Sequence, residues 1–421
     1  MTGSTLAQKI IARAAGRAGV TVGEIVTCRV DLAMFHDSSG PRRLAPMLQE
    51  LGAKIRDPRR IVLVLDHYVP EGDEESRRIV RVAREWAAQA GLRHVHDSQG
   101  ICHVVLPERG HLRPGMFAVG GDSHSPTGGA FGAYMFGVGA TEMLGAVVTG
   151  EIWLRVPQTI RYEWGGRLPA GVGAKDVMLF LLGRFGMNGG RYQAVEFAGS
   201  AVGAMSMQER MTLSNMTAEL GAQAGLCAAD ETTRRYLMAA GVEDPQVDGW
   251  CSDVDAPVEE HHVFDAAALA PQVAAPHSPA NARPVDACAG QAIDIAYLGA
   301  CTGAKLEDMR AAARVLRGRR IAPGVQLLLA PASLRDLDTA KREGTLAALR
   351  DAGAQLLPSA CGACAGYGGS IPEGATVISS TARNFRGRMG ARTAEVWLAS
   401  PFTVAASALA GRIADPRECL K

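Results

Sequence analysis

The chain has 421 residues, of which 47% are apolar, and a formal net charge of +1. This length predicts two to four domains, and the near-neutral charge gives no case for nucleic acid as a partner. No apolar run is long enough for a membrane span, and the first residues lack the layout of a secretion signal. Nine cysteines without regular spacing are typical of a reducing compartment, so we expect a cytoplasmic protein.

Acid–base residues follow the strands expected in the N-terminal third. The expected elements are a strand at 61–65, an amphipathic helix at 74–90 and a strand at 116–119. Asp66 and His67 directly follow the first strand, Asp122 and His124 follow the second, and His103 lies between these pairs. A neighbouring carboxylate orients a histidine and tunes its pKa, so such pairs at strand ends indicate catalysis.

The middle of the chain carries a second pair of polar residues. Asn215 and Glu219 are four positions apart, so a helix would place both on one face. The stretch 256–289 is rich in Ala, Pro and Val, and we expect it to be a linker to the next domain. The predicted domains are therefore 1–157, 158–285 and 286–421.

Strands and helices alternate in the C-terminal third. The expected strands are 294–298, 325–330, 354–357 and 375–379, with helices at 305–318 and after Ser333 as N-cap. This order predicts a parallel sheet with right-handed crossovers, and ligands bind such sheets beyond the carboxyl ends of the strands. Cys301, Cys361, Cys364 and the arginine-rich segment 381–388 all follow strand ends. Thiolates and arginines should therefore lie along one edge.

Three cysteines are one too few for a structural zinc site or for complete [4Fe–4S] ligation. They would leave one iron open to bind a substrate oxygen as a Lewis acid. An isolated CxxC also occurs in redox pairs and zinc sites, and single histidines such as His94 and His96 are more often structural than catalytic. A cluster that faces an anionic substrate is the economical interpretation.

Five motifs, in order, carry a resemblance to a known family. They are the segments Gly121–Gly132, Ser214–Gly221, Gly299–Lys305, Cys361–Cys364 and Arg383–Arg388. The chain resembles the 3-isopropylmalate dehydratase large-subunit family, within the aconitase superfamily of [4Fe–4S] hydro-lyases, over nearly its whole length. The resemblance implies an α/β fold of three related α/β/α units with mostly parallel sheets around a central cluster. It also implies an enzyme that dehydrates and rehydrates a small hydroxy dicarboxylic acid.

The resemblance also implies residue roles. Three cysteines would hold the [4Fe–4S] cluster: Cys301, Cys361 and Cys364. The pair that protonates the departing hydroxyl would be Asp66 and His67. The network around the iron-bound water would be His103, Glu219, Asp122 and His124. Residues that contact the substrate or approach the cluster would be His36, Ser123, Asn215, Arg383 and Arg388. Arginine suits carboxylates because its planar fork binds both oxygens.

The chain departs from the family pattern near these residues. Relatives typically read Gly-Ser-Cys-Thr-Asn-Gly-Arg where this chain has Gly299-Ala-Cys-Thr-Gly-Ala-Lys305. Ala382 replaces a usual Asn, and Gly128 replaces a common His. Three interpretations stay open: a 3-isopropylmalate enzyme, a paralogue for another diacid of the maleate, citraconate, dimethylmalate or homoaconitate type, or a site that has lost activity. The three cysteines and the two arginines Arg383 and Arg388 argue against the third. A non-enzymatic iron-responsive binding protein would need a fused fourth domain and a basic surface, for which the sequence gives no hint.

The resemblance further implies a missing catalytic group. In this superfamily the base is a serine on a swivelling fourth domain, which isopropylmalate-type enzymes carry on a separate small subunit. The chain ends at Lys421, directly after the segment 415–419, which resembles the C-terminal segment of the large subunit in relatives. We therefore expect a heteromer with a small subunit, and no nucleic acid or membrane partner.

Overall fold

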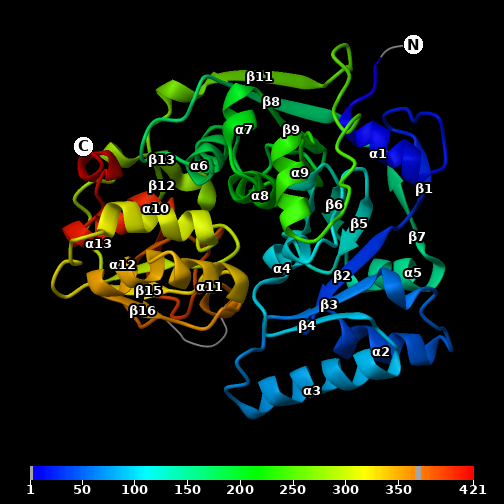
Figure 1. Cartoon of the computed structure of the whole chain (residues 1–421), viewed down its shortest axis with the longest axis horizontal. Helices are drawn as coiled ribbons and strands as arrows, with labels where there is room; N and C mark the ends of the chain where they lie inside the picture. Colours follow the sequence, from blue (N-terminus) through cyan, green and yellow to red (C-terminus); the bar gives the residue numbers. More distant parts are fainter. Residues whose placement is uncertain (1–2, 366–370) are drawn as a thin grey trace. The chain divides into compact units, whose positions relative to one another are not determined.

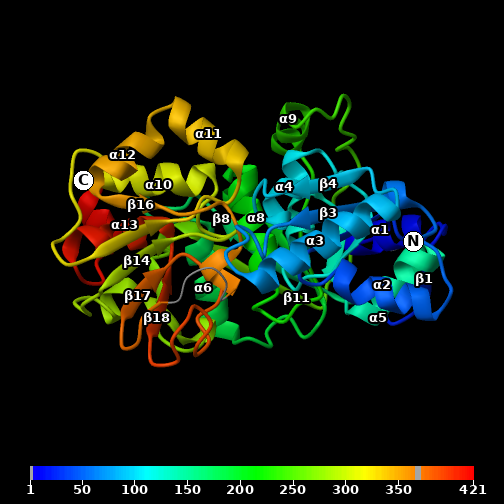
Figure 2. The same cartoon turned by 90° about the horizontal axis from the view of Figure 1, so that it is seen from below.

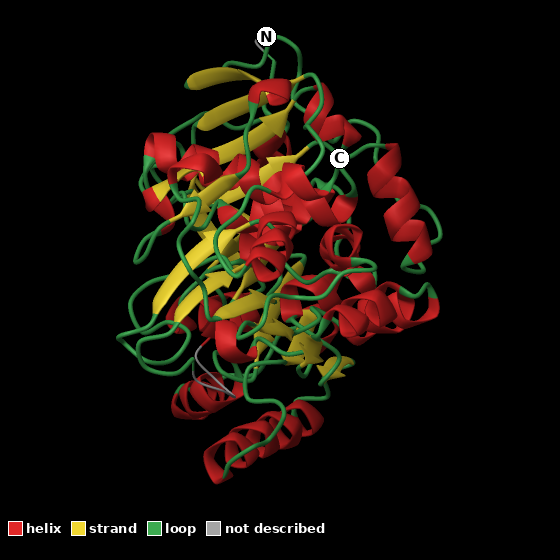
Figure 3. Cartoon of the chain, turned by 90° about the vertical axis from the view of Figure 1, so that its left-hand side faces the viewer, coloured by secondary structure: helices red, strands yellow, loops and turns green. Residues whose placement is uncertain are grey.

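The computed structural model describes residues 3–365 and 371–421. The chain divides into two compact units, of which the first comprises Met1–Ser98, Val105–Gly165 and Gly190–Phe264. The second comprises Gln99–Val104, Gly166–Gly189 and Asp265–Lys421. Strands lie side by side with helices packed against them, as the chain-order colours of Figure 1 and the secondary-structure colours of Figure 3 show. The mixed helix and strand content with mostly parallel pairing confirms the predicted α/β class.

A five-stranded parallel sheet in the order β4-β3-β2-β5-β6 forms the centre of unit 1. Its strands are β2 (Leu32–His36), β3 (Ile61–Leu65), β4 (His94–Asp97), β5 (Phe117–Gly120) and β6 (Tyr134–Gly137). From β2 the chain builds outward through β3 and β4, and then returns to add β5 and β6 on the other side. This reversal is the topological switch at which open α/β sheets bind ligands.

The helix between β3 and β4 shows how the local sequence sets an element. In α3 (Glu74–Gln89), Asp73 caps the first turn by accepting the backbone N–H of Ser76. Ile79, Ala83 and Trp86 are buried along one face, which confirms the predicted amphipathic helix. The other helices of the sheet region are α1 (Leu6–Ala14), α2 (Pro41–Glu50), α4 (Cys102–Glu108) and α5 (Ala140–Thr149).

Unit 1 also contains a four-stranded sheet in the order β10-β9-β8-β11 and a two-stranded antiparallel sheet. The four-stranded sheet comprises β8 (Thr159–Gly165), β9 (Ala194–Ala198), β10 (Ala224–Cys227) and β11 (Glu260–Asp265), and the small sheet pairs β1 (Ile25–Arg29) with β7 (Glu151–Arg155). The accompanying helices are α7 (Ser200–Ala204), α8 (Met207–Met216) and α9 (Glu231–Ala239). A capping box of Ser206 and Glu209 begins α8.

Unit 2 is built on a seven-stranded sheet in the order β13-β12-β18-β17-β14-β15-β16. Five strands run parallel: β14 (Ile295–Leu298), β15 (Gln326–Leu329), β16 (Ala354–Leu356), β17 (Thr376–Ser379) and β18 (Glu395–Ala399). The antiparallel edge consists of β12 (Gln272–Ala274) and β13 (Ala282–Pro284). Here the chain order reverses at β14, because β15 and β16 extend one side and β17 and β18 the other.

Helices cover one face of this sheet, as the yellow to red segments of Figure 2 show. They are α10 (Leu306–Leu316), α12 (Thr345–Ala352) and α13 (Pro401–Ala410), accompanied by α11 (Leu334–Arg342). The helix α6 (Ala174–Phe185), from the middle of the chain, instead contacts the strands β12, β13 and β18. Buried residues of the first three helices pack with Leu298 and Leu327 into one core cluster. Tyr297 and Val377 point to the opposite face, where they form a second cluster with Val396 and Met389.

Two predictions need correction. The stretch 256–289 does pass from unit 1 to unit 2, but it is not a plain linker because it includes β11, β12 and β13. These strands are only three to six residues long, and the high Ala and Pro content of the stretch is not typical of strands. Asn215 and Glu219 do not share a helix, since α8 ends at Met216 and Gly221, with φ +78°, closes the turn that follows. The division at 157 and 285 stays a prediction. No helix in the described chain is long and apolar enough to cross a membrane.

Candidate active site

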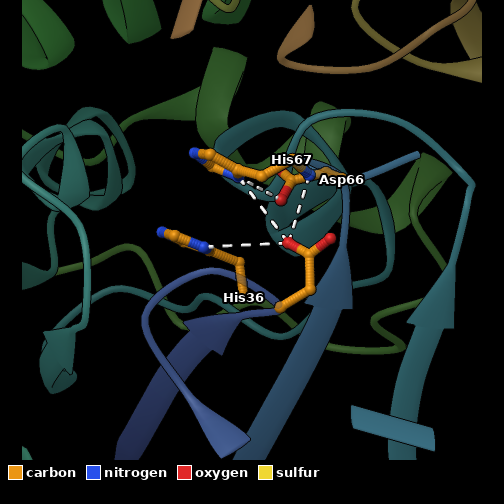
Figure 4. A group of neighbouring side chains, drawn as sticks. His36, Asp66 and His67 are labelled. Carbon is orange, nitrogen blue, oxygen red and sulfur yellow. Dashed lines mark hydrogen bonds and ion pairs between the residues drawn. The ribbon is translucent and has the colours of Figure 1, made fainter. Parts of the chain in front are cut away.

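A buried carboxylate–imidazole pair lies at the end of β3, where the sequence predicts it. Asp66 is fully buried, and its Oδ1 lies 2.7 Å from Nδ1 of His67. Figure 4 shows the two side chains beside His36, which is the last residue of the neighbouring strand β2. Burial alone lowers the pKa of His67, but the charge and hydrogen bond of Asp66 outweigh it and raise the pKa to about 9. At neutral pH His67 is therefore a positively charged proton donor.

A second carboxylate, which sequence reasoning missed, organises the backbone beneath this pair. Asp37 is fully buried and accepts the backbone N–H of His67 at 3.1 Å and of Tyr68 at 2.8 Å. Burial, together with the charge of Asp66, raises the pKa of Asp37. The sequence signal was its position directly after His36 at the end of a strand, the same pattern that pointed to Asp66.

His36 is oriented by the loop that follows it. Its Nδ1 accepts the backbone N–H groups of Ser38 at 3.2 Å and Ser39 at 3.3 Å. Because Nδ1 accepts these bonds, Nε2 is the ring nitrogen that can donate. That atom lies 3.5 Å from Oδ2 of Asp122, so His36 connects the acid pair with the residues that follow β5.

The residues after β5 form a chain of polar contacts. The backbone N–H of His124 donates to Oδ1 of Asp122 at 2.7 Å, and its Nε2 lies 2.9 Å from Oε1 of Glu219. Nδ2 of Asn215 donates to Oγ1 of Thr127 at 2.8 Å. His124, Glu219 and Asn215 are buried, whereas Ser123 is exposed. Unit 1 thus brings together five predicted acid–base residues and the predicted substrate residue His36. The five are Asp66, His67, Asp122, His124 and Glu219.

In unit 2 the three cysteines follow β14 and β16, as predicted. Cys301 and Cys364 are buried, and Cys361 is partly buried. Burial, and then the nearby charges of Cys364 and Cys361, raise the pKa of Tyr297. Tyr297 lies on β14, the strand that leads to Cys301, so the thiols of both loops belong to one region. Three cysteine thiols in the described loops after β14 and β16 are a donor set that fits an iron–sulfur cluster with one open iron. Residues 366–370, next to this CxxC, lie outside the described part of the chain.

The predicted arginines follow β17. The loop is anchored by fully buried Asn384, whose Nδ2 donates to the carbonyl oxygens of Ala275 at 3.0 Å and Val396 at 2.9 Å. Arg383 and Arg388 flank this anchor and are partly buried. Nε of Arg388 is buried and has no hydrogen-bond partner among the described residues. A buried guanidinium donor of this kind is suited to an anionic ligand. His103 is buried in the first turn of α4, whose residues up to Val104 are assigned to unit 2 and the rest to unit 1.

The departures from the family pattern have structural correlates. Nζ of Lys305 is buried and donates to the carbonyl oxygen of Cys301 at 3.0 Å and to Oδ2 of Asp308 at 2.6 Å. It thereby stabilises the cysteine loop itself. A Cβ at Gly303 would overlap the side chain of Ser380 and lie 2.5 Å from its carbonyl oxygen. A Cβ at Gly128 would lie 2.8 Å from the side chain of Met135.

Parallel α/β sheets with acid–base residues at one switch point, and with cysteines and arginines at another, define an enzyme of the hydro-lyase class. The chain belongs to the aconitase family: the family model described as "Aconitase family (aconitate hydratase)" matches residues 8–411.

Similar proteins include the 3-isopropylmalate dehydratase large subunit 1 of Methanopyrus kandleri, which is 43% identical over 99% of this chain and 100% of that protein. The 3-isopropylmalate dehydratase large subunit of Oleidesulfovibrio alaskensis is 42% identical over 98% of this chain and 99% of its own. The 3-isopropylmalate dehydratase large subunit 1 of Pyrococcus furiosus is 39% identical over 100% of this chain and 100% of that protein. The crystal structure of Thermococcus kodakaraensis aconitase X in its holo form shows a remote likeness, with a TM-score of 0.49 and 14% identity over 85% of this chain and 84% of that one.

Proposed function

We propose that this chain is the large subunit of a two-subunit [4Fe–4S] hydro-lyase that acts on 3-isopropylmalate. The observation that carries the proposal is the buried Asp66–His67 pair. The pKa of its histidine is raised to about 9, so the ring keeps its proton at neutral pH. A group that stays charged at neutral pH in a buried site is suited to protonate a departing hydroxyl. The full-length similarity to 3-isopropylmalate dehydratase large subunits supports this choice of substrate.

His67 would deliver its proton from Nε2, because Nδ1 is bound to Asp66. Water would then leave instead of hydroxide, which is a poor leaving group. Asp66 would stabilise the charged ring before transfer and hold its orientation throughout. The contacts between His124 and Glu219 and between His36 and Asp122 would hold further protons close to the substrate hydroxyl.

Cys301, Cys361 and Cys364 would hold the cluster. When bound, it supplies an open iron that acts as a Lewis acid toward the substrate oxygens. Arg383 and Arg388 would bind the substrate carboxylates, since the unpartnered Nε of Arg388 is a buried donor ready for an anion. These positive charges would also stabilise the negative charge that develops when a carbon-bound proton is removed. The base for that proton would be a serine of the small subunit.

The test is to purify the chain anaerobically with its small subunit and to measure the turnover of hydroxy diacids. Dehydration of 3-isopropylmalate can be followed by the ultraviolet absorbance of the unsaturated product. We expect turnover of 3-isopropylmalate in preference to maleate or citraconate hydration, and none by the isolated chain. Preferred turnover of another diacid would reject the substrate, and full activity of the chain alone would reject the two-subunit enzyme.

A further inference from the structure

A buried lysine occupies the first turn of α6. Lys175 is 2% exposed and follows Ala174, the first residue of the helix. The helix dipole disfavours a positive charge at this end, and burial of an ammonium group is costly unless it is fully hydrogen-bonded. A lysine here therefore needs strong compensating contacts.

Those contacts are made with two loops at the switch point of the seven-stranded sheet. Nζ of Lys175 donates to the carbonyl oxygens of Ser380 at 2.7 Å and Thr381 at 2.5 Å, and to Oγ1 of Thr302 at 3.2 Å. An ammonium group has three N–H donors, so three acceptors from two loops can engage all of them. Thr302 directly follows Cys301 after β14, and Thr381 lies two residues before Arg383 after β17.

Further hydrogen bonds link the two loops to each other. Oγ1 of Thr302 donates to the carbonyl oxygen of Ser380 at 3.1 Å, and Oγ of Ser380 accepts the backbone N–H of Gly299 at 3.0 Å. Oγ1 of Thr381 donates to the carbonyl oxygen of Arg383 at 3.3 Å. The ammonium group of Lys175 therefore bonds to both loops of a network that extends from Gly299 to Arg383.

The helix that carries Lys175 is fixed in turn. Oδ1 of Asp176 accepts the backbone N–H of Gln272 on β12 at 2.8 Å, and its Oδ2 accepts that of Gly173 at 2.9 Å. Asp176 is fully buried. The first turn of α6 is thus attached to the edge of the same sheet, and Lys175 extends from a rigid base.

We propose that Lys175 is a positioning residue that sets the placement of the Cys301 thiolate relative to the Arg383 guanidinium. This inference rests on the proposed function, in which the first group holds the cluster and the second binds substrate carboxylate. The buried ammonium group also contacts Thr302, which directly follows Cys301, so its positive charge would favour the negative charge of the proposed cluster and substrate. An arginine would present a planar fork instead of three divergent donors, and a methionine would leave buried carbonyl groups without a donor.

The first experiment uses the cluster-free full chain and needs no activity. We would compare Lys175→Met with Lys341→Met, which changes an exposed lysine of the same unit. Hydrogen exchange should become faster in both segments 299–305 and 379–385 of the first variant and stay unchanged in the second. Faster exchange confined to α6, or no change in either loop, would overturn the proposal.

The second experiment uses the reconstituted two-subunit enzyme. Loss of the three hydrogen bonds of Lys175 should displace both loops, so Lys175→Met should raise KM by roughly 10- to 100-fold and speed the loss of iron. A purely structural lysine would lower the melting temperature without a change in KM or iron retention, and that result would reject the positioning role. If Lys175→Met does not fold, Thr302→Val removes one acceptor of Lys175 and the bond that Thr302 donates to Ser380, and it should change KM in the same direction but less. An unchanged KM in a folded Thr302→Val enzyme would then refute the proposal.

The two experiments separate the inference from the proposed function. Faster exchange in both loops with no turnover of any diacid would support the loop connection while rejecting the enzyme. Unchanged hydrogen exchange in both loops of an active Lys175→Met enzyme would support the proposed function and reject the positioning role of Lys175.

Discussion

The imidazole rings of His36 and His67 stack with their centroids 3.8 Å apart and their planes 10° from parallel. They come from the ends of two neighbouring strands, β2 and β3 (Figure 4). Two stacked rings at this distance repel each other strongly if both are charged. Backbone N–H groups hold Nδ1 of His36 as an acceptor, whereas Nδ1 of His67 is bonded to Asp66. The stack thus places the proton donor His67 against a ring whose orientation is fixed by the backbone.

The first prediction concerns the pH dependence of turnover. The protonated form of His67 is the donor, and it is lost as the pH rises through its pKa of about 9. In Asp66→Asn the largest charge that raises this pKa is removed, and only Asp122 and Asp37 still oppose the effect of burial. The alkaline limb of kcat should therefore move to lower pH. A kcat–pH profile measured with the same cluster content checks this, and an unmoved limb would show that another group donates the proton.

The second prediction separates acid catalysis from cofactor binding. His67→Ala should lower kcat by roughly two to four orders of magnitude, the usual contribution of a positioned acid. Iron content and visible absorbance should stay those of the unaltered enzyme, because His67 is no cluster ligand. Joint loss of cluster and turnover would contradict the assigned role. The matched control is His261→Ala, which changes an exposed histidine of the same unit.

The third prediction tests the cluster ligands. Cys301→Ser, Cys361→Ser and Cys364→Ser should each abolish the visible absorbance and the bound iron of the anaerobically purified protein. Cys251→Ser changes an exposed cysteine and should leave both unaltered. A normal spectrum in any of the first three variants would remove that residue from the ligand set. Stoichiometric zinc in the unaltered protein would count against the cluster itself.

Local patterns predicted the strands and the residues directly after them. Residues 61–65 are an apolar run that the structure retains as β3, and the N-cap Ser333 with Asp336 in the first turn of α11 needs only neighbouring residues to be recognised. Local patterns could not predict contacts between residues that are far apart in the sequence. Lys175 is separated from Thr302 by 127 positions, and a lysine at the start of a helix has no local sign of burial. The short strands of the stretch 256–289 form because neighbouring strands supply their hydrogen bonds, so their sequence shows little periodicity.

The fourth prediction concerns stability in acid. Nε2 of His111 lies 2.7 Å from Nε2 of His96, and burial, followed by the charges of His96 and His94, lowers the pKa of His111 to about 3. The unfolded chain takes up this proton near pH 6.5, whereas the folded chain does so only near 3. Stability should therefore fall as the pH drops from about 6.5 toward 3.

The variant His111→Gln removes this difference and should flatten the acid limb of the melting temperature. Melting curves of the cluster-free chain at a series of pH values measure it. His261→Gln serves as the control with an exposed histidine. An acid limb in His111→Gln as steep as in the unaltered chain would contradict the assignment.

The last prediction concerns the loop that departs from the family pattern. Because a Cβ at Gly303 would overlap the side chain of Ser380, Gly303→Asn should destabilise the chain by about 1–3 kcal/mol, the usual cost of overpacking. Ser380→Gly alone also destabilises, since Oγ of Ser380 accepts the N–H of Gly299 and donates to nearby carbonyl groups such as that of Gly303. The double variant should be more stable than the sum of both losses predicts, because Ser380→Gly relieves the side-chain part of the overlap although the carbonyl oxygen of residue 380 remains close. Urea unfolding of all four proteins measures this coupling, and strict additivity would show that Ser380 does not exclude the family asparagine.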